Sequence, residues 1–175
     1  MTDRITRRTL LAAPGLLPLA VQAASAQPAG GPERTTSKIL VAYFSRSGNT
    51  RVIAGTLQRE LGADLFEIRP ERPYPDDYEE TVAEATRERD SGFEPPLEAV
   101  VADIAAYDTI FLGLPIWGET APPVIRSFLR ALDLMGKTLR PFITHGGYGP
   151  GSSMAVLADH APGARILPPL VMEAE

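Results

Sequence analysis

From residue 38 onward, apolar runs alternate with amphipathic segments. The runs KILVAYF and TIFLGLPIWG are almost continuously apolar, as parallel strands covered on both faces must be. Pro168 and Pro169 interrupt the last run and cannot donate to a sheet ladder, so that strand should be an edge strand or irregular at its middle. The runs predict strands at Lys38–Phe44, Asp64–Ile68, Thr109–Gly118, Arg140–Thr144 and Arg165–Met172.

Between these runs, apolar residues recur at helical spacing. Ile53, Leu57 and Leu61 recur at i, i+4 and i+8, and Gly62 follows where a helix C-terminus favours a left-handed residue. Helices are predicted at Thr50–Leu61, in an acidic stretch through about Asp90, from Pro122 toward Gly136, and at Ser153–His160. We interpret the charges of the acidic stretch as a solvated face. The alternation of strand and helix predicts an α/β fold with a doubly wound parallel sheet.

The first 37 residues do not follow this alternation. Residues 1–26 combine a basic start, an uncharged apolar middle and a small-residue end, which predicts an export signal peptide cleaved after Ala26. Arg7 and Arg8 precede the apolar stretch and resemble a twin-arginine signal, although a general secretory signal also tolerates two arginines. Residues 27–37 are rich in Pro, Gly and polar residues and predict a flexible leader. We therefore expect a periplasmic protein with no stable membrane span.

The remaining domain, residues 38–175, is acidic. Loss of residues 1–26 removes three arginines and one aspartate, which moves the formal net charge from −5 to −7. Nucleic acid is an unsuitable partner for such a chain, because phosphate neutralisation needs a basic patch. The absence of cysteine excludes disulfides, thiolate metal ligands and thiol catalysis, and the two histidines belong to no metal-binding pattern. No catalytic residue and no metal ligand is predicted.

Ligands of doubly wound sheets bind at the carboxyl ends of the strands, near the point where strand order reverses. Three loops qualify: Ser45–Thr50, Pro115–Thr120 and His145–Ser152. The first combines hydroxyl and amide side chains with the N-terminus of a helix, which suits an anion, although these side chains could also only cap the helix. It lacks the motifs that bind nucleoside triphosphates and NAD, so a phosphate monoester fits better. The other two loops supply the only tryptophan and a glycine-rich segment.

These three segments, SRSGNT, YDTIFLGLPIWG and PFITHGGYGPGSS, together resemble flavodoxins and flavodoxin-like FMN proteins from about Lys38 to Leu170. The resemblance implies a five-stranded sheet of order 2-1-3-4-5, with noncovalent FMN at the switch point between the first and third strands and no metal. Such chains usually continue into a helix after the last strand, and this sequence lacks one. We therefore expect either an apolar face that a homo-oligomer could cover, or a truncated gene product.

The resemblance also assigns roles to individual positions. The FMN phosphate is expected to bind Ser45, Ser47, Gly48, Asn49 and Thr50, with Arg46 and Arg51 as outer neighbours. One side of the isoalloxazine ring is expected to lie against Pro115, Ile116, Trp117 and Gly118. The other wall is expected to consist of Thr144, His145, Gly146, Gly147 and Tyr148, with backbone N–H groups near the pyrimidine end of the ring.

The function implied by this resemblance is electron transfer to a redox partner protein or a small-molecule electron acceptor. Two alternatives remain open. One is an NAD(P)H-dependent FMN quinone or flavin reductase, which is an enzyme rather than a carrier. The other is a non-redox binding module that keeps the flavodoxin-like fold.

Overall fold

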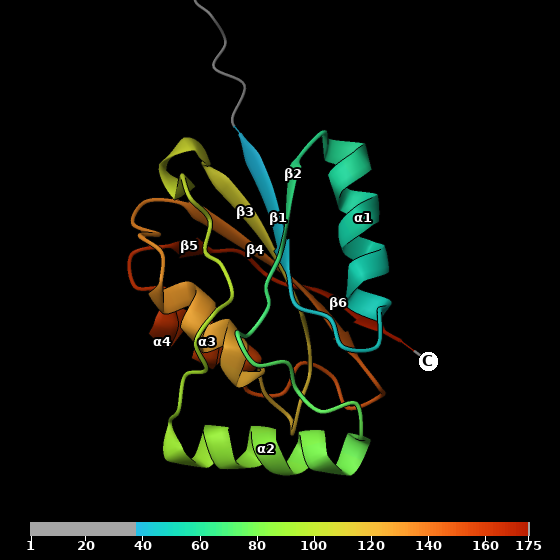
Figure 1. Cartoon of the computed structure of the whole chain (residues 1–175). Helices are drawn as coiled ribbons and strands as arrows, with labels where there is room; N and C mark the ends of the chain where they lie inside the picture. The colour runs from blue at the N-terminus through green and yellow to red at the C-terminus, as the bar shows by residue number, and fades with distance from the viewer. Residues whose placement is uncertain (1–37, 175) are drawn as a thin grey trace, which may run out of the picture. The chain divides into compact units, whose positions relative to one another are not determined.

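The computed structural model describes residues 38–174 (Figure 1). The expected export signal and leader, residues 1–37, lie outside the described residues. In chain order the elements are β1 (Ile39–Tyr43), α1 (Asn49–Leu61), β2 (Asp64–Glu67), α2 (Tyr78–Ser91), a short 3₁₀ helix (Ile104–Ala106), β3 (Thr109–Pro115), α3 (Pro123–Arg130), β4 (Thr138–His145), α4 (Ser153–His160), β5 (Arg165–Ile166) and β6 (Leu170–Glu173). This order confirms the predicted α/β alternation.

All strand pairs in the sheet are parallel, and the order β2-β1-β3-β4-β5 is the one that the resemblance implied. The expected fifth strand is split into β5 and β6, which both pair with β4. Pro168 and Pro169 lie in the gap between them, because neither has an N–H group to donate. The sheet therefore has six strands rather than five. Within residues 38–174, no helix follows β6.

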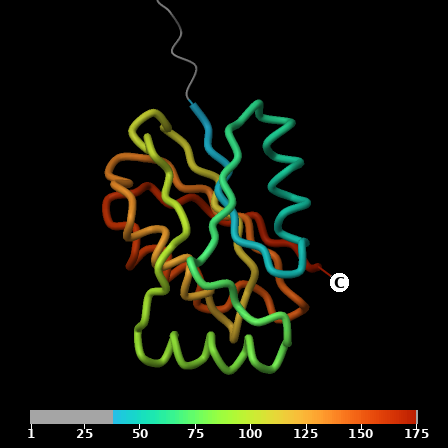
Figure 2. The backbone as a smooth tube through the Cα atoms, in the orientation of Figure 1, coloured from blue at the N-terminus to red at the C-terminus, as the bar shows by residue number. Residues whose placement is uncertain are grey.

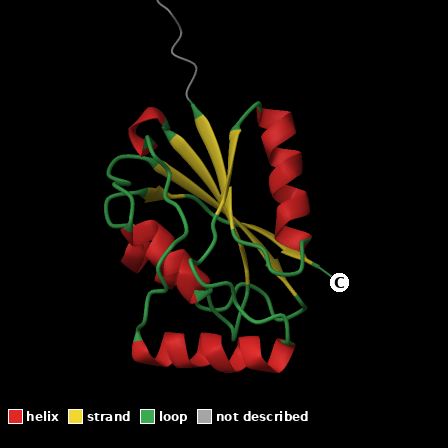
Figure 3. Ribbon diagram, in the orientation of Figure 1, coloured by secondary structure: helices red, strands yellow, loops and turns green. Residues whose placement is uncertain are grey.

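Helix α1 packs on one face of the sheet, and α3 and α4 pack on the other (Figure 3). The larger part of the core lies between α3, α4 and the sheet, where Phe128 and Leu157 are fully buried with the side chains of β3. On the α1 face, the Phe142 ring lies directly over Gly113, where a Cβ atom would collide with it. Only glycine fits this position, so the ring can pack tightly on β3.

Helix α3 ends earlier than the spacing predicted. It stops at Arg130 instead of continuing toward Gly136. The Asp133 carboxylate accepts a hydrogen bond from the backbone N–H of Met135 at 3.1 Å. Aspartate side chains compete in this way with the helical backbone, so the segment forms turns instead.

Helix α2 covers neither face of the sheet. It lies across the carboxyl ends of the strands, as the ribbon and the tube through the Cα atoms both show (Figures 1 and 2). Its N-terminus is capped by Asp77, whose carboxylate accepts the backbone N–H of Glu80 at 2.9 Å. No helix in residues 38–174 is long and apolar enough to span a bilayer.

Candidate functional site

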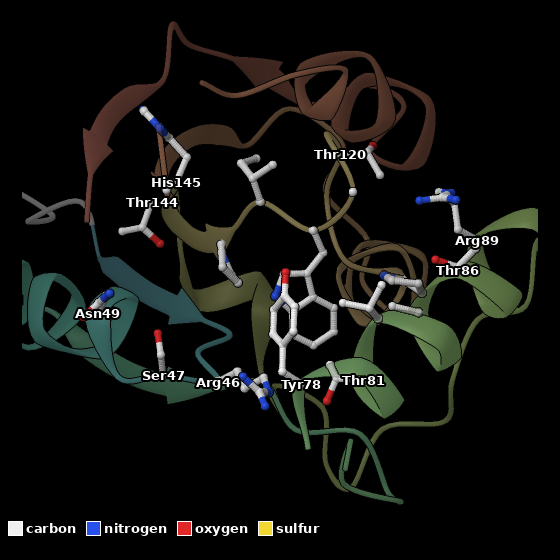
Figure 4. Close-up of a pocket in the computed structure, with 18 of the residues that line it drawn as sticks. Arg46, Ser47, Asn49, Tyr78, Thr81, Thr86, Arg89, Thr120, Thr144 and His145 are labelled. Atoms are coloured by element: carbon white, nitrogen blue, oxygen red, sulfur yellow. The ribbon is translucent and has the colours of Figure 1, made fainter. Parts of the chain in front are cut away.

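A cavity of about 320 Å³ lies at the carboxyl ends of β1, β3 and β4 (Figure 4). This volume is in the range of small-molecule sites. The structure brings the three predicted loops together around it. The predicted residues that line it are Ser47, Asn49, Pro115, Ile116, Trp117, Gly118, Thr144, His145 and Gly146. The cavity therefore lies at the switch point between β1 and β3.

One end of the cavity is formed by the start of α1. The N-cap residue Gly48 has a left-handed backbone with φ 98°, and as a glycine it has no side chain that could cap the helix. Ser45 does not line the cavity; its Oγ accepts the N–H of Gly48 at 3.1 Å and closes the turn. The N–H groups of the first turn give a helix N-terminus a partial positive charge. With the exposed hydroxyl of Ser47 beside it, this end suits an anion.

The two arginines of this loop differ in position. Arg46 lines the cavity, and its guanidinium donates to the carbonyl of Asp76 at 2.6 Å. Arg51 instead forms an ion pair with Glu67 at 2.8 Å, outside the cavity. Partial burial acts to raise the pKa of Glu67, but its ion pairs with Arg69 and Arg51 outweigh burial and lower the pKa. Arg46 is thus the cation at the anion end.

Thr50 and Thr144 form a hydroxyl pair. Thr50 is 1% exposed, and its Oγ1 lies 2.8 Å from Oγ1 of Thr144. Thr144 lines the cavity, whereas Thr50 does not. The hydrogen bond between the two hydroxyls connects the first turn of α1 to β4. Thr50 therefore stabilises the position of the Ser45–Thr50 loop and does not contact the cavity.

The Trp117 indole forms an apolar wall. It packs edge-on against Phe44 at a centroid distance of 5.2 Å and against Tyr74 at 4.9 Å. The tight turn from Trp117 to Thr120 is closed by backbone hydrogen bonds in both directions. Its two central residues, Gly118 and Glu119, have φ of 55° and 63°. This left-handed pair is typical of a type I′ turn, which holds the indole in place.

The loop after β4 folds around His145. Nδ1 of the imidazole accepts the backbone N–H groups of Gly147 at 3.0 Å and Gly149 at 3.2 Å. Gly147 therefore directs its N–H at the histidine and does not line the cavity, whereas Gly146 does. Tyr148 lies outside the cavity and is 87% exposed.

Helix α2 forms the opposite wall of the cavity. Most of its charged side chains, Glu79, Glu80, Arg87 and Asp90, are exposed, as the sequence predicted, and a different, mostly uncharged face of the helix lines the cavity. Figure 4 shows Thr81, Thr86 and Arg89 of α2 on the other side from Asn49 and Thr144. The α2 residues that line the cavity are Tyr78, Thr81, Val82, Ala85, Thr86 and Arg89.

A sequence signal for this wall was present. The spacing of Tyr78, Val82, Ala85 and Arg89 places these residues on one face of a helix. The side chains of Tyr78 and Val82 are 66% and 42% exposed. This part of the helix therefore presents apolar side chains that are open toward the cavity. A bound ligand would cover it.

Two buried polar groups hold α2 against the Trp117 wall. The Tyr74 hydroxyl donates to the Glu88 carboxylate at 2.7 Å, and Glu88 is 8% exposed. Burial raises the pKa of Glu88, the nearby Glu84 charge adds to this, and the hydrogen bond from Tyr74 opposes it. Burial also raises the pKa of the Tyr74 hydroxyl well above its ordinary value. Within residues 38–174, no group of His, Asp and Glu side chains could hold a metal ion.

Residues 38–175 match the protein-family model described as Flavodoxin. A candidate flavoprotein from Bacteroides eggerthii is 35% identical, with a TM-score of 0.71, over 78% of this chain and 88% of that one. The flavoprotein from Lactobacillus acidophilus in complex with FMN is 23% identical, with a TM-score of 0.68, over 78% and 93%. Oxidised flavodoxin 2 from Bacillus cereus is 24% identical, with a TM-score of 0.50, over 78% and 84%. No curated protein matches the chain.

Proposed function

Because this chain belongs to the flavodoxin family, we propose that it binds FMN in the cavity at the strand ends and transfers electrons through it. One observation carries this proposal. A single cavity has the N-terminus of α1 at one end and the Trp117 wall elsewhere on its surface. FMN joins a phosphate monoester to a flat aromatic ring and so matches both. The FMN complex of the Lactobacillus acidophilus flavoprotein, which shares the fold, supports the same cofactor.

The residues at the anion end suit a phosphate held mainly by neutral donors. Ser47, Asn49 and the N-terminus of α1 would bind it, with Arg46 as the nearby cation. A hydrogen bond to a charged group contributes about 1.5–3 kcal/mol net, so a few such donors are enough to anchor a phosphate.

At the ring end, Ile116 and Trp117 would lie against the isoalloxazine. Open space lies beside Gly146, where a Cβ atom would meet nothing within 4 Å, so a flat ring can approach this backbone closely. Helix α2 would cover the ring and keep water away from it. When bound, FMN supplies one-electron or hydride chemistry, and the protein positions it and sets its surroundings.

The absorption spectrum of the freshly purified protein tests this proposal. We expect the visible bands of an oxidised flavin, and bound FMN that is released as such on denaturation. Added FMN should also lose fluorescence when it binds apoprotein. A colourless protein that leaves the fluorescence of added FMN unchanged would instead support a non-redox binding module.

An NAD(P)H-dependent quinone or flavin reductase is the second candidate. The observation in its favour is a second cleft beside the cavity, which shares Arg89, Gly118 and Thr120 with it. Steady-state oxidation of NAD(P)H by the FMN-loaded protein with quinone acceptors separates the two functions. Turnover indicates a reductase, and its absence leaves an electron carrier that serves a partner protein.

We also propose export by the N-terminal segment, which lies outside the described residues. A twin-arginine route transports folded proteins and would allow FMN to be loaded before export. Replacement of Arg7 and Arg8 by Lys should then retain the precursor in the cytoplasm, as seen by fractionation and immunoblotting. Unchanged export would indicate the general secretory route.

A further inference from the structure

The second cleft has a volume of about 500 Å³ and lies next to the flavin cavity. Its walls come from the turn after β3, the loop after β4, and helices α2, α3 and α4. The residues that line it are Arg89, Gly118, Glu119, Thr120, Arg126, Tyr148, Gly151, Ser152 and Val156. The turn from Trp117 to Thr120 thus separates two ligand-sized spaces.

Arg126 of α3 is the most informative residue of this cleft. Its Nε atom is buried without a hydrogen-bond partner, and its guanidinium forms no ion pair within residues 38–174. By contrast, Arg130 on the same helix pairs with Glu94 at 2.5 Å. Arg126 as a whole is half-buried and lines the cleft, so the rest of its guanidinium is open to an acceptor from outside the chain. A cation that is partly removed from water and has no partner is stabilised when an anion meets it.

Arg89 brings a second guanidinium to the same cleft. It lies against the turn after β3, where a Cβ atom on Gly118 would be only 2.5 Å from its Nη1. The Arg89 guanidinium can therefore lie against this turn only because residue 118 is a glycine. Its Nε donates to Asp90 at 3.0 Å, so its charge is partly balanced. Glu119 is the acidic group of the cleft, and it forms no ion pair with either arginine in the part of the chain that the structure describes.

Tyr148 supplies an aromatic surface to the cleft. Its side chain is 87% exposed and lies on the glycine-rich loop that folds around His145. An exposed tyrosine in the same cleft as two guanidinium groups suits a ligand that combines a flat ring with a negative charge.

We propose that this cleft binds a flat organic anion, whose carboxylate or sulfonate meets Arg126 and Arg89 and whose ring lies on Tyr148. The proposal rests on the proposed function only for the identity of the neighbouring ligand, FMN. The shared turn after β3 would place the anion beside the flavin, which is where a small-molecule electron acceptor belongs. Guanidinium pairs select carboxylates and sulfonates over neutral analogues because the hydrogen bonds are charge-assisted.

Titration calorimetry with anthraquinone sulfonate tests the site, with a neutral hydroxymethyl anthraquinone as the matched ligand. The FMN-loaded protein should bind the sulfonate about tenfold more tightly than the neutral compound, and R126Q should remove this preference. R130Q removes the same charge from the same helix outside the cleft and should leave the preference unchanged. E119Q should tighten sulfonate binding by about twofold, because it removes the opposing charge.

Three results would overturn the proposal: no sulfonate binding by the wild-type protein, no preference over the neutral compound, or equal losses in R126Q and R130Q. If R126Q does not fold, R89Q and E119Q test the site instead. R89Q should weaken sulfonate binding and E119Q should strengthen it, and any other pair of results would contradict the site. FMN affinity, measured in parallel, separates the two proposals. A protein that binds the sulfonate but not FMN would refute the flavin function and keep this cleft.

Discussion

The two walls of the cavity at the strand ends are held by different kinds of interaction. The strand-end loops follow directly from the sheet: the parallel register of β1, β3 and β4 brings their carboxyl ends to one edge. Each loop is then shaped by its own backbone, through the left-handed Gly48, the turn from Trp117 to Thr120 and the N–H groups that His145 Nδ1 accepts.

No strand pairing holds helix α2 in place. It is held by side chains: the Tyr74–Glu88 hydrogen bond and the Thr81 hydroxyl, which lies 2.7 Å from the Pro75 carbonyl. Arg46 also reaches from the loop after β1 to the carbonyl of Asp76, just before the helix. Changes in the loops should therefore act on ligand contacts, whereas changes around α2 should act on whether the wall forms.

The largest effect is expected at Trp117, where the two walls meet. W117A removes the ring that packs on Phe44 and Tyr74. We expect a loss of about 2–3 kcal/mol in unfolding free energy, below the cost for a fully buried aromatic residue. Affinities for FMN and riboflavin should fall together, as measured by flavin fluorescence. W117F keeps an aromatic ring and serves as the control; an effect of W117F equal to that of W117A would contradict the aromatic role.

Y74F should loosen α2 specifically. It leaves the buried Glu88 carboxyl without its donor, which costs about 1–3 kcal/mol in urea unfolding. FMN and riboflavin affinities should fall by the same factor, because α2 faces the cavity but does not form its anion end. The double variant Y74F/E88L removes both partners and should cost less than the sum of the two single variants. Additive losses would show that the hydrogen bond does not hold the wall.

S47A should act on the phosphate alone. Loss of one hydroxyl donor to a charged group should weaken FMN about tenfold and leave riboflavin, which has no phosphate, unchanged. Competition between the two flavins for apoprotein measures the ratio directly. Equal losses for both would mean that this loop does not hold the phosphate.

Thr50 should respond differently from Ser47. T50V leaves the buried Thr144 hydroxyl without its partner, so we expect a loss of about 1 kcal/mol in stability. The double variant T50V/T144V should recover part of this loss. A purely ligand-binding role for Thr50 predicts no change in apoprotein stability, which would contradict the paired hydroxyls.

The smallest effect is the pH dependence that Glu88 contributes. Its pKa in the folded protein is raised above the ordinary 4.5, so the fold favours the protonated carboxyl. This contribution is complete below pH 4.5 and is lost as the pH rises through the folded value. E88Q keeps an acceptor for Tyr74 and removes this titration, so its advantage in Tm over the wild type should grow with pH.

Much of the site could be predicted from sequence because its loops follow strands. An apolar run ends where its loop begins, so the order of residues along the chain is enough to assign Ser47, Trp117 and Gly146 to one edge of the sheet. Thr50 and Tyr148 could not be placed in this way. Their spacing fits the motif, but the direction of each side chain depends on contacts that the motif does not specify. For Thr50 the contact is Thr144, far away in sequence, and for Tyr148 it is the folding of its own loop around His145.

The sequence by itself determined the alternation of strands and helices, the break at Pro168 and Pro169, and the three loops at one edge, because periodicity and proline chemistry act locally. Only the tertiary structure decided that α2 closes the cavity and that Arg126 and Arg89 line one cleft beside it. An acidic helix with a weak apolar stripe can remain solvated or pack on a neighbour, and its own residues do not distinguish these states. Hydrogen bonds between α2 or the residues just before it and the rest of the domain decide between them, among them Tyr74–Glu88 and Arg46–Asp76.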